Sequence, residues 1–234
     1  MASSRRKQRQ GKTRRTIAYS AIAIALVVTL AFLYLSSQNN QAKPVILYVN
    51  QGNGVVNGAN FGQMLSFASS HGFNTIFFQA YREGVLLFTS SELRSFVNQT
   101  HADHQKIFFA LYITNSTQAI PETIFGLGED GINLDMSTVG LPAQESLLQS
   151  LSTSCGCRTA VTTTDMASPL KPDLLILETY GLAMQQYVRQ GIIASVGVFA
   201  TSSQQDYQSE FRYALTNSDG VMVFDYAGLL KTGY

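Results

Sequence analysis

Four short apolar runs of this sequence end on a carboxylate: Asp135, Asp165, Glu178 and Asp225. A charged side chain is costly inside a sheet, but it is tolerated at the rim, where it meets water or a substrate. Parallel α/β barrels build their active sites from side chains at the carboxyl ends of several strands. If these four ends converge, they form a carboxylate-rich pocket of the kind that cleaves glycosidic bonds with two carboxyl groups.

Asp135 and Glu178 are the strongest candidates for catalysis. Asp135 ends the run of residues 131–135, where the alternation of side chains along a strand puts Asn133 and Asp135 on the same face. Glu178 ends the apolar run of residues 174–177, and glutamate is not among the preferred N-cap residues of helices. One carboxyl group could be a nucleophile and the other a general acid, with pKa values driven apart by different surroundings. In the alternative, each carboxylate only caps a following helix.

Tyrosines and an arginine accompany the same strand ends. Tyrosine combines a flat apolar face with a hydroxyl group, and this combination suits a sugar ring. Some of these tyrosines are expected to be ordinary core residues, and Asp165 could instead be a turn residue in the loop that it precedes. The expected substrate-binding residues are Tyr48, Tyr81, Arg82, Tyr112, Asp165, Tyr180, Asp225 and Tyr226.

Other hydrolase chemistries lack their sequence signatures. The chain contains no Gly-x-Ser-x-Gly, P-loop or His-Glu-x-x-His pattern, which disfavours serine-triad and metal hydrolases. The only cysteines, Cys155 and Cys157, have no further cysteine or histidine cluster with which to form a zinc site. A local disulfide and a pair of free thiols both remain open for them. We expect no metal and no cofactor.

The chain from residue 44 onward alternates apolar runs with longer amphipathic segments, which favours a parallel sheet. The expected strands are residues 45–49, 75–80, 106–113, 131–135, 158–164, 173–177, 192–199 and 221–224. The expected helices are residues 61–70, 91–100, 121–127, 142–152, 182–189 and 204–217. This order predicts an α/β fold, a (β/α)8 TIM-type barrel that is trimmed because the helices after the fifth and eighth strands are short or absent. An open doubly wound sheet is the alternative, but the glycines at residues 52–58 depart from the dinucleotide-binding pattern.

The N-terminal segment predicts a membrane anchor. Residues 1–16 contain seven of the sixteen basic residues and no acidic one, and residues 17–35 are 19 residues without a charge. About 20 apolar residues cross the hydrocarbon core of a bilayer, and positively charged flanks stay in the cytoplasm. We therefore expect a cytoplasmic tail at residues 1–16 and an uncleaved transmembrane signal anchor at residues 17–37, in preference to a cleaved signal peptide. A polar tether at residues 38–43 and an extracytoplasmic barrel domain at residues 44–234 follow.

The net charge of the chain beyond residue 37 indicates which partners it can bind. Beyond residue 37 the chain has nine basic and fifteen acidic residues, and 9 − 15 gives −6. An acidic domain is not expected to bind nucleic acid or anionic lipid. The expected partners are a polysaccharide or glycan and, through the single-pass anchor, the cell membrane.

Two motifs carry a resemblance to a known family. An aspartate that ends the fourth strand, in Gly131-Ile-Asn-Leu-Asp135, and a glutamate that ends the sixth, in Leu175-Ile-Leu-Glu178, resemble the endo-α-1,4-polygalactosaminidase and spherulin-4 group of glycoside hydrolases. The resemblance implies a retaining pair that acts on amino-sugar polysaccharide, with Asp135 as the nucleophile and Glu178 as the acid/base. The trimmed crossover after the fifth strand and the absence of tryptophan depart from that group.

These features together predict a membrane-anchored, outward-facing protein that cleaves cell-surface or extracellular polysaccharide with two carboxylates. The carboxyl groups of Asp135 and Glu178 are expected to face one pocket, about 5–5.5 Å apart in a retaining enzyme or about 6.5–9.5 Å apart in an inverting one. The alternative is a non-catalytic, degenerate barrel that binds a glycan or an envelope protein partner.

Overall fold

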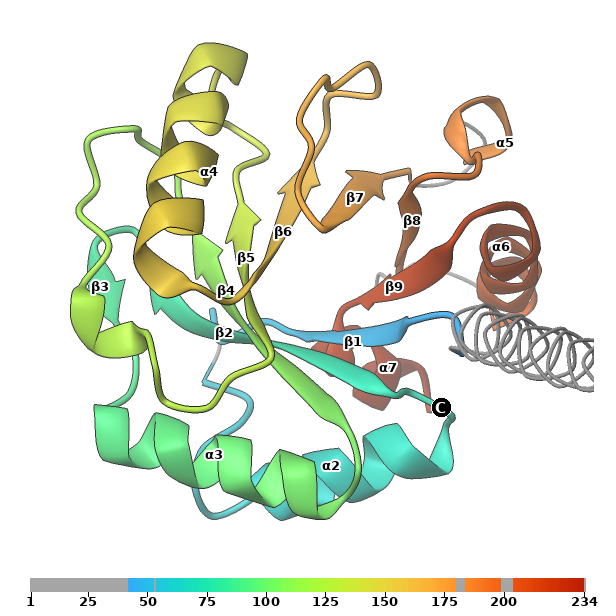
Figure 1. Cartoon of the computed structure of the whole chain (residues 1–234). Coiled ribbons are helices and arrows are strands. Elements are labelled where there is room, and N and C mark those ends of the chain that lie inside the picture. Colours follow the sequence, from blue (N-terminus) through green and yellow to red (C-terminus); the bar gives the residue numbers. More distant parts are fainter. Residues whose placement is uncertain (1–41, 53, 180–183, 199–203, 234) are drawn as a thin grey trace, which may run out of the picture. The chain divides into compact units, whose positions relative to one another are not determined.

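Eight parallel strands close into a barrel in the computed structural model, which describes residues 42–52, 54–179, 184–198 and 204–233 (Figure 1). The strands lie in the order β1-β9-β8-β7-β6-β5-β4-β2, and pairing of β1 with β2 closes the ring. The short β3 adds to β2 as an antiparallel hairpin. The strands are β1 (Val45–Val49), β2 (Thr75–Arg82), β3 (Val85–Leu86), β4 (Lys106–Tyr112), β5 (Gly131–Asp135), β6 (Arg158–Thr163), β7 (Leu174–Glu178), β8 (Ile193–Gly197) and β9 (Gly220–Phe224).

The predicted closed barrel is therefore confirmed, and the open doubly wound sheet is excluded. The unit formed by Lys43–Tyr234 contains all of these strands. The predicted anchor at residues 17–37 lies outside the described residues. Within the described ranges, no helix has both the length and the apolar character needed to cross a membrane.

Helices surround the barrel, with α2 beside α3, α4 against β6, and α6 against β8 and β9 (Figure 1). As predicted, no helix joins β6 to β7, and the chain after β9 forms only the seven-residue α7. The third crossover holds a single 3₁₀ turn where a longer helix was predicted. The helical elements are α2 (Phe61–Ser70), α3 (Ser90–Ala102), η1 (Glu122–Ile124), α4 (Leu141–Cys155), α5 (Met184–Tyr187), α6 (Gln204–Asn217) and α7 (Tyr226–Thr232).

Alternating side chains of the strands form two cores, one inside the barrel and one between the barrel and its helices. The inner core contains large aromatic side chains, among them Phe77 and Phe108, whose ring centroids are 5.0 Å apart. Gly131 lies against Phe108: a Cβ atom there would collide with the Phe108 ring and would lie 2.6 Å from the carbonyl oxygen of Arg158. Close packing of this kind fills the barrel interior with side chains.

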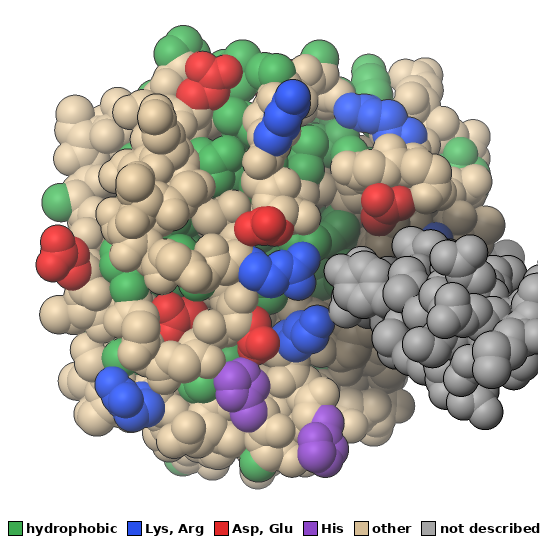
Figure 2. Space-filling view, in the orientation of Figure 1, with side chains coloured by type: hydrophobic (Ala, Val, Ile, Leu, Met, Phe, Trp, Pro, Cys, Tyr) green, Lys and Arg blue, Asp and Glu red, His purple; other side chains and the backbone are tan. Residues whose placement is uncertain are grey.

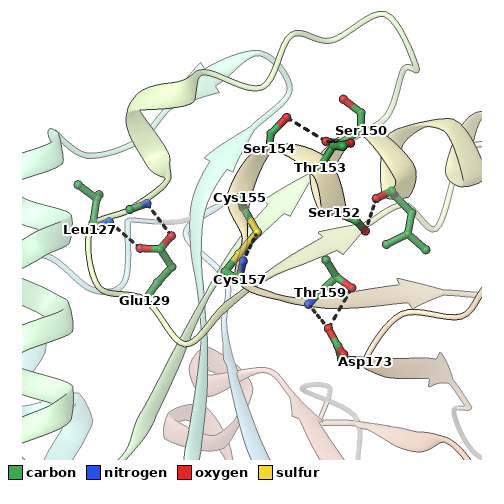
Figure 3. Close-up of a disulfide and its surroundings, with 12 residues drawn as sticks. Leu127, Glu129, Ser150, Ser152, Thr153, Ser154, Cys155, Cys157, Thr159 and Asp173 are labelled. Atoms are coloured by element: carbon green, nitrogen blue, oxygen red, sulfur yellow. Dashed lines mark hydrogen bonds between the residues drawn. A yellow bond between two sulfur atoms is a disulfide. The ribbon is translucent and has the colours of Figure 1, made fainter.

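Cys155 and Cys157 form a disulfide, which answers the question that their spacing left open. Figure 3 shows the bond between the last turn of α4 and the start of β6, with Gly156 in the left-handed backbone region between them. This position is at the amino-terminal end of β6. The disulfide is therefore remote from the carboxyl ends of the strands, where a barrel places its active site.

Charged side chains are dispersed on the face shown in Figure 2. Lysine, arginine, aspartate and glutamate side chains lie singly or next to groups of opposite sign, among many neutral side chains. On this face the described residues present no broad patch of one charge.

Candidate active site

A pocket of about 310 Å³ opens at the carboxyl ends of the parallel strands. Its walls come from β2, β4, β5, β7 and β9 and from short segments that follow β1 and β5. Its described lining residues are Asn50, Gln79, Arg82, Tyr112, Asp135, Ser137, Glu178 and Phe224. The structure thus brings Asp135 and Glu178 into one pocket, together with Arg82 and Tyr112 from the expected substrate-binding set.

Asp135 is buried at the end of β5, with only 5% of its surface exposed. The Tyr48 hydroxyl donates a hydrogen bond of 2.8 Å to its Oδ2 atom, and the Ser137 hydroxyl donates one of 3.2 Å to its Oδ1 atom. Burial raises the pKa of this carboxyl group to about 6, with the Tyr48 hydrogen bond opposing the rise and the charge of Glu178 adding to it. Asp135 is therefore ionised at pH 7, but it is more basic than an ordinary aspartate.

Glu178 lies half-buried at the end of β7. Its side chain follows the same alternation as Leu174 and Ile176, which pack inside the barrel, so it points toward the pocket that it lines. Burial is the main cause of the raised pKa of Asp135, and the negative charge of Glu178 in the same pocket adds to it. Two carboxyl groups with different exposure can divide the roles of nucleophile and general acid.

Two polar side chains lie inside the barrel next to Asp135, on the side toward the start of β5. Asn133 is fully buried on the same face of β5, as the alternation predicted. The Thr162 hydroxyl of β6 donates a hydrogen bond of 3.0 Å to the Oδ1 atom of Asn133. This contact links β5 to β6 below the carboxyl group of Asp135.

A β-bulge in β2 decides which side chain of that strand reaches the pocket. The pairing of β2 with β4 shifts between Gln79 and Tyr81, so that Ala80 and Tyr81 both pack in the outer core. Arg82 then turns inward opposite Tyr112, and both line the pocket. Bulges re-aim side chains in this way. Tyr81 instead donates a hydrogen bond of 3.1 Å to the carbonyl oxygen of Ala119, and it does not line the pocket.

The other expected substrate-binding residues have different surroundings. Tyr48 is fully buried inside the barrel and contacts Asp135 from below. Tyr226 packs in the outer core, and the centroid of its ring lies 5.2 Å from that of the Phe67 ring. Asp165 is exposed and accepts a hydrogen bond of 3.0 Å from the backbone N–H of Ala167, as a turn residue does.

Asp225 caps a helix, a role that was not predicted for it. It is the N-cap of α7, and its Oδ1 atom accepts a hydrogen bond of 2.9 Å from the backbone N–H of Gly228. It does not line the described pocket, and Tyr180 lies outside the described residues.

Sequence reasoning missed four of the pocket residues: Asn50, Gln79, Ser137 and Phe224. Gln79 and Phe224 fall on the inward face of their strands, and alternation counted from the apolar side chains would have found them. Asn50 and Ser137 lie just beyond strand ends, where only the loop path decides their direction. Within the described residues, no group of three histidine, cysteine or acidic side chains is arranged to hold a metal ion.

Replacing Tyr48 by phenylalanine is expected to raise the pKa of Asp135 further, because the hydrogen bond from Tyr48 stabilises the ionised carboxylate. Carboxyl ¹³C NMR titration measures this pKa, and the signal can be assigned by its loss in Asp135→Asn. Tyr213→Phe on α6 is the matched control and should leave the pKa of Asp135 unchanged. An unchanged or lower pKa of Asp135 in Tyr48→Phe would contradict the stabilising role of this hydrogen bond.

Comparison with known proteins concerns the fold. The sequence matches no family model and no curated protein. Its structure is similar to that of CpGH84B, with a TM-score of 0.53 and 7% identity over 77% of this chain and 44% of that one. It is also similar to an HpcH/HpaI aldolase from Desulfitobacterium hafniense DCB-2, with a TM-score of 0.52 and 8% identity over 85% and 92% of the two chains. The spore cortex-lytic enzyme SleL of Bacillus cereus gives a TM-score of 0.47 and 11% identity over 66% and 50%.

The present chain spans about half the length of SleL and 44% of the length of CpGH84B. The TM-scores of 0.53 and 0.52 show a shared fold, and identities of 7% and 8% support nothing finer. Because barrels of this architecture support many unrelated reactions, the reaction has to be argued from the side chains of the pocket. The comparisons thus confirm that this chain is a closed parallel α/β barrel.

Proposed function

We propose that this protein is a glycoside hydrolase-like enzyme that cleaves polysaccharide with Asp135 and Glu178. The observation that carries the proposal is the pairing of these two carboxyl groups in one pocket, where the charge of Glu178 helps to raise the pKa of Asp135. Two carboxyl groups flanking one glycosidic bond are the usual machinery of glycoside hydrolysis.

Asp135 is suited to be the nucleophile. Both of its oxygen atoms accept hydrogen bonds, which favour the ionised form, while burial makes that ion more basic. Its carboxylate oxygen attacks the anomeric carbon, and the bond from that carbon to the leaving oxygen breaks. Tyr48 and Ser137 hold the carboxylate in place during the attack.

Glu178 is suited to be the acid/base. It is half-buried in the pocket wall, so its carboxyl group can exchange a proton with water. It donates that proton to the leaving oxygen, and then takes a proton from a water whose oxygen attacks the anomeric carbon and breaks the bond from that carbon to Asp135. The products are two sugar chains, and both carboxyl groups return to their starting states.

The proposed substrates are cell-surface or extracellular polysaccharides, and amino-sugar polymers are the first to test. The proposed location follows from the expected anchor at residues 17–37 and the basic tail at residues 1–16. Protease added outside intact cells should then digest residues 44–234. Protection of that part of the chain would contradict an outward orientation.

The full-length protein, purified in mild detergent, should release sugars from at least one polymer in a panel that includes amino-sugar polysaccharides. ¹H NMR of the first-formed product should show the anomer of the substrate for a retaining enzyme. Inversion would instead assign Asp135 as the base that activates water. Polymer binding without release of sugar would favour the non-catalytic, glycan-binding alternative.

Glu178→Gln is expected to lower kcat on the natural polymer by roughly 10²–10⁴-fold, the usual contribution of general acid–base catalysis. In aryl glycosides with a good leaving group, the leaving oxygen departs with little need for protonation. The attack of Asp135 on these substrates should therefore slow much less in Glu178→Gln. Glu145→Gln on the exposed surface of α4 is the matched control and should keep wild-type kcat. Equal losses on both kinds of substrate would contradict an acid role for Glu178.

A further inference from the structure

Arg82 places a guanidinium group in the same pocket as the two carboxyl groups. The bulge in β2 turns its side chain inward, and its Cζ atom lies 5.3 Å from the centre of the Tyr112 ring. On another side it lies against the loop after β1, because a Cβ atom added to Gly52 would collide with its Nη1 atom. The guanidinium is thus confined between an aromatic face and a glycine backbone.

In the described part of the chain, this guanidinium forms no ion pair, and no side chain or backbone oxygen accepts a hydrogen bond from it. The oxygen atoms of Asp135 already accept hydrogen bonds from Tyr48 and Ser137. Of the other polar lining residues, Asn50 and Gln79 are neutral amides, and Glu178 is a carboxyl group whose charge acts on Asp135 and which has an interaction of its own. The donors of Arg82 are therefore available to a ligand.

A sugar bound in this pocket would displace water from the guanidinium. Removing water from an unpaired charge is costly, and an anionic partner offsets that cost. The planar fork of arginine matches a carboxylate in particular, because two parallel N–H groups reach its two oxygen atoms. A neutral sugar offers hydroxyl oxygens that accept hydrogen bonds, but no negative charge to balance that of the guanidinium.

We propose that Arg82 binds the carboxylate of an acidic sugar unit, so that the substrate is a uronic-acid-containing polysaccharide. This inference rests on the proposed glycoside hydrolysis for the identity of the ligand as a sugar. It concerns recognition by Arg82, whereas the proposed cleavage concerns Asp135 and Glu178. Measurements of binding therefore test the recognition by Arg82, and measurements of turnover test the cleavage.

The test uses an octasaccharide of alternating N-acetylhexosamine and uronic acid, and the same octasaccharide after chemical reduction of its carboxyl groups. Titration calorimetry on the full-length protein measures both affinities. The acidic form is expected to bind roughly 10- to 100-fold more tightly, as a hydrogen bond to a charged group contributes. Arg82→Gln should abolish this preference, and Arg82→Lys should keep a smaller one because it retains the charge without the fork.

Arg94→Gln on the exposed surface of α3 is the control for net charge and should keep the full preference. Equal binding of the two octasaccharides by the wild type, or an unchanged preference in a folded Arg82→Gln protein, would overturn the proposal. Circular dichroism and the thermal midpoint show whether Arg82→Gln is folded, and Arg82→Lys remains decisive if it is not. If the preference is present but no polymer is cleaved, carboxylate recognition stands and the proposed hydrolysis fails.

Discussion

Replacing Asp135 by asparagine is expected to lower kcat by roughly 10²–10⁴-fold or more, and to do so on activated aryl glycosides as well as on polymers. The amide keeps the size of the side chain and can still accept the hydrogen bond that Tyr48 donates to Asp135. It cannot form the bond to the anomeric carbon, however good the leaving group is. This uniform loss is the opposite of the substrate-dependent loss expected for Glu178→Gln.

Initial rates of sugar release from the polymer and of aryl glycoside cleavage measure the loss on the two kinds of substrate. Asp103→Asn is the matched control, because Asp103 is an exposed aspartate that ends α3 outside the barrel. Glycan binding by Asp135→Asn, measured by calorimetry, should persist. Wild-type turnover in a folded Asp135→Asn protein would exclude Asp135 as the nucleophile.

The buried carboxyl group of Asp135 is also expected to make the protein less stable as pH rises from about 4 to 6. Its pKa is about 6 in the folded protein against an ordinary value of 3.8, so the folded state binds this proton more tightly than the unfolded chain. The free energy of unfolding therefore falls with pH across this window and levels off above it. A shift of about two pH units corresponds to roughly 3 kcal/mol for this group.

Asp135→Asn has no proton to lose, so it should be more stable than the wild type at pH 7 by up to roughly 3 kcal/mol. Urea unfolding of both proteins between pH 4 and 8 measures their free energies of unfolding. Subtracting one from the other at each pH removes the contributions of the other titrating groups. Asp103→Asn should follow the wild-type curve. A difference between wild type and Asp135→Asn that does not change with pH would contradict the raised pKa.

If both outcomes are found, Asp135 contributes to turnover and lowers stability at neutral pH. The outer-core side chains Tyr81 and Tyr226 are buried tyrosines that contribute to packing. Asp135 is a buried carboxyl group in a pocket that also holds Glu178, and such perturbed groups are enriched at functional sites. The fold does not supply this argument, since CpGH84B and an aldolase share the barrel to a similar degree.

The sequence predicted the strands and most of the helices because their signals are local. Alternation and short apolar runs specify β5 without reference to the rest of the chain, and they also place Asn133 and Asp135 on one face. The short hairpin strand β3 was missed because two residues carry no periodicity. The helix expected in the third crossover was wrong in extent: the structure retains one 3₁₀ turn, at Glu122–Ile124.

By itself, the sequence determined a closed barrel with carboxylates at its strand ends, because buried strands and the charges that terminate them are visible in a few consecutive residues. Only the tertiary structure decided which of those charges share a pocket. Asp225 caps α7, whereas Asp135 meets a tyrosine that is 87 positions away in the chain. The β2 bulge exchanges Tyr81 for Arg82 at the pocket wall. Register between distant strands fixes both outcomes, and no local pattern of residues encodes that register.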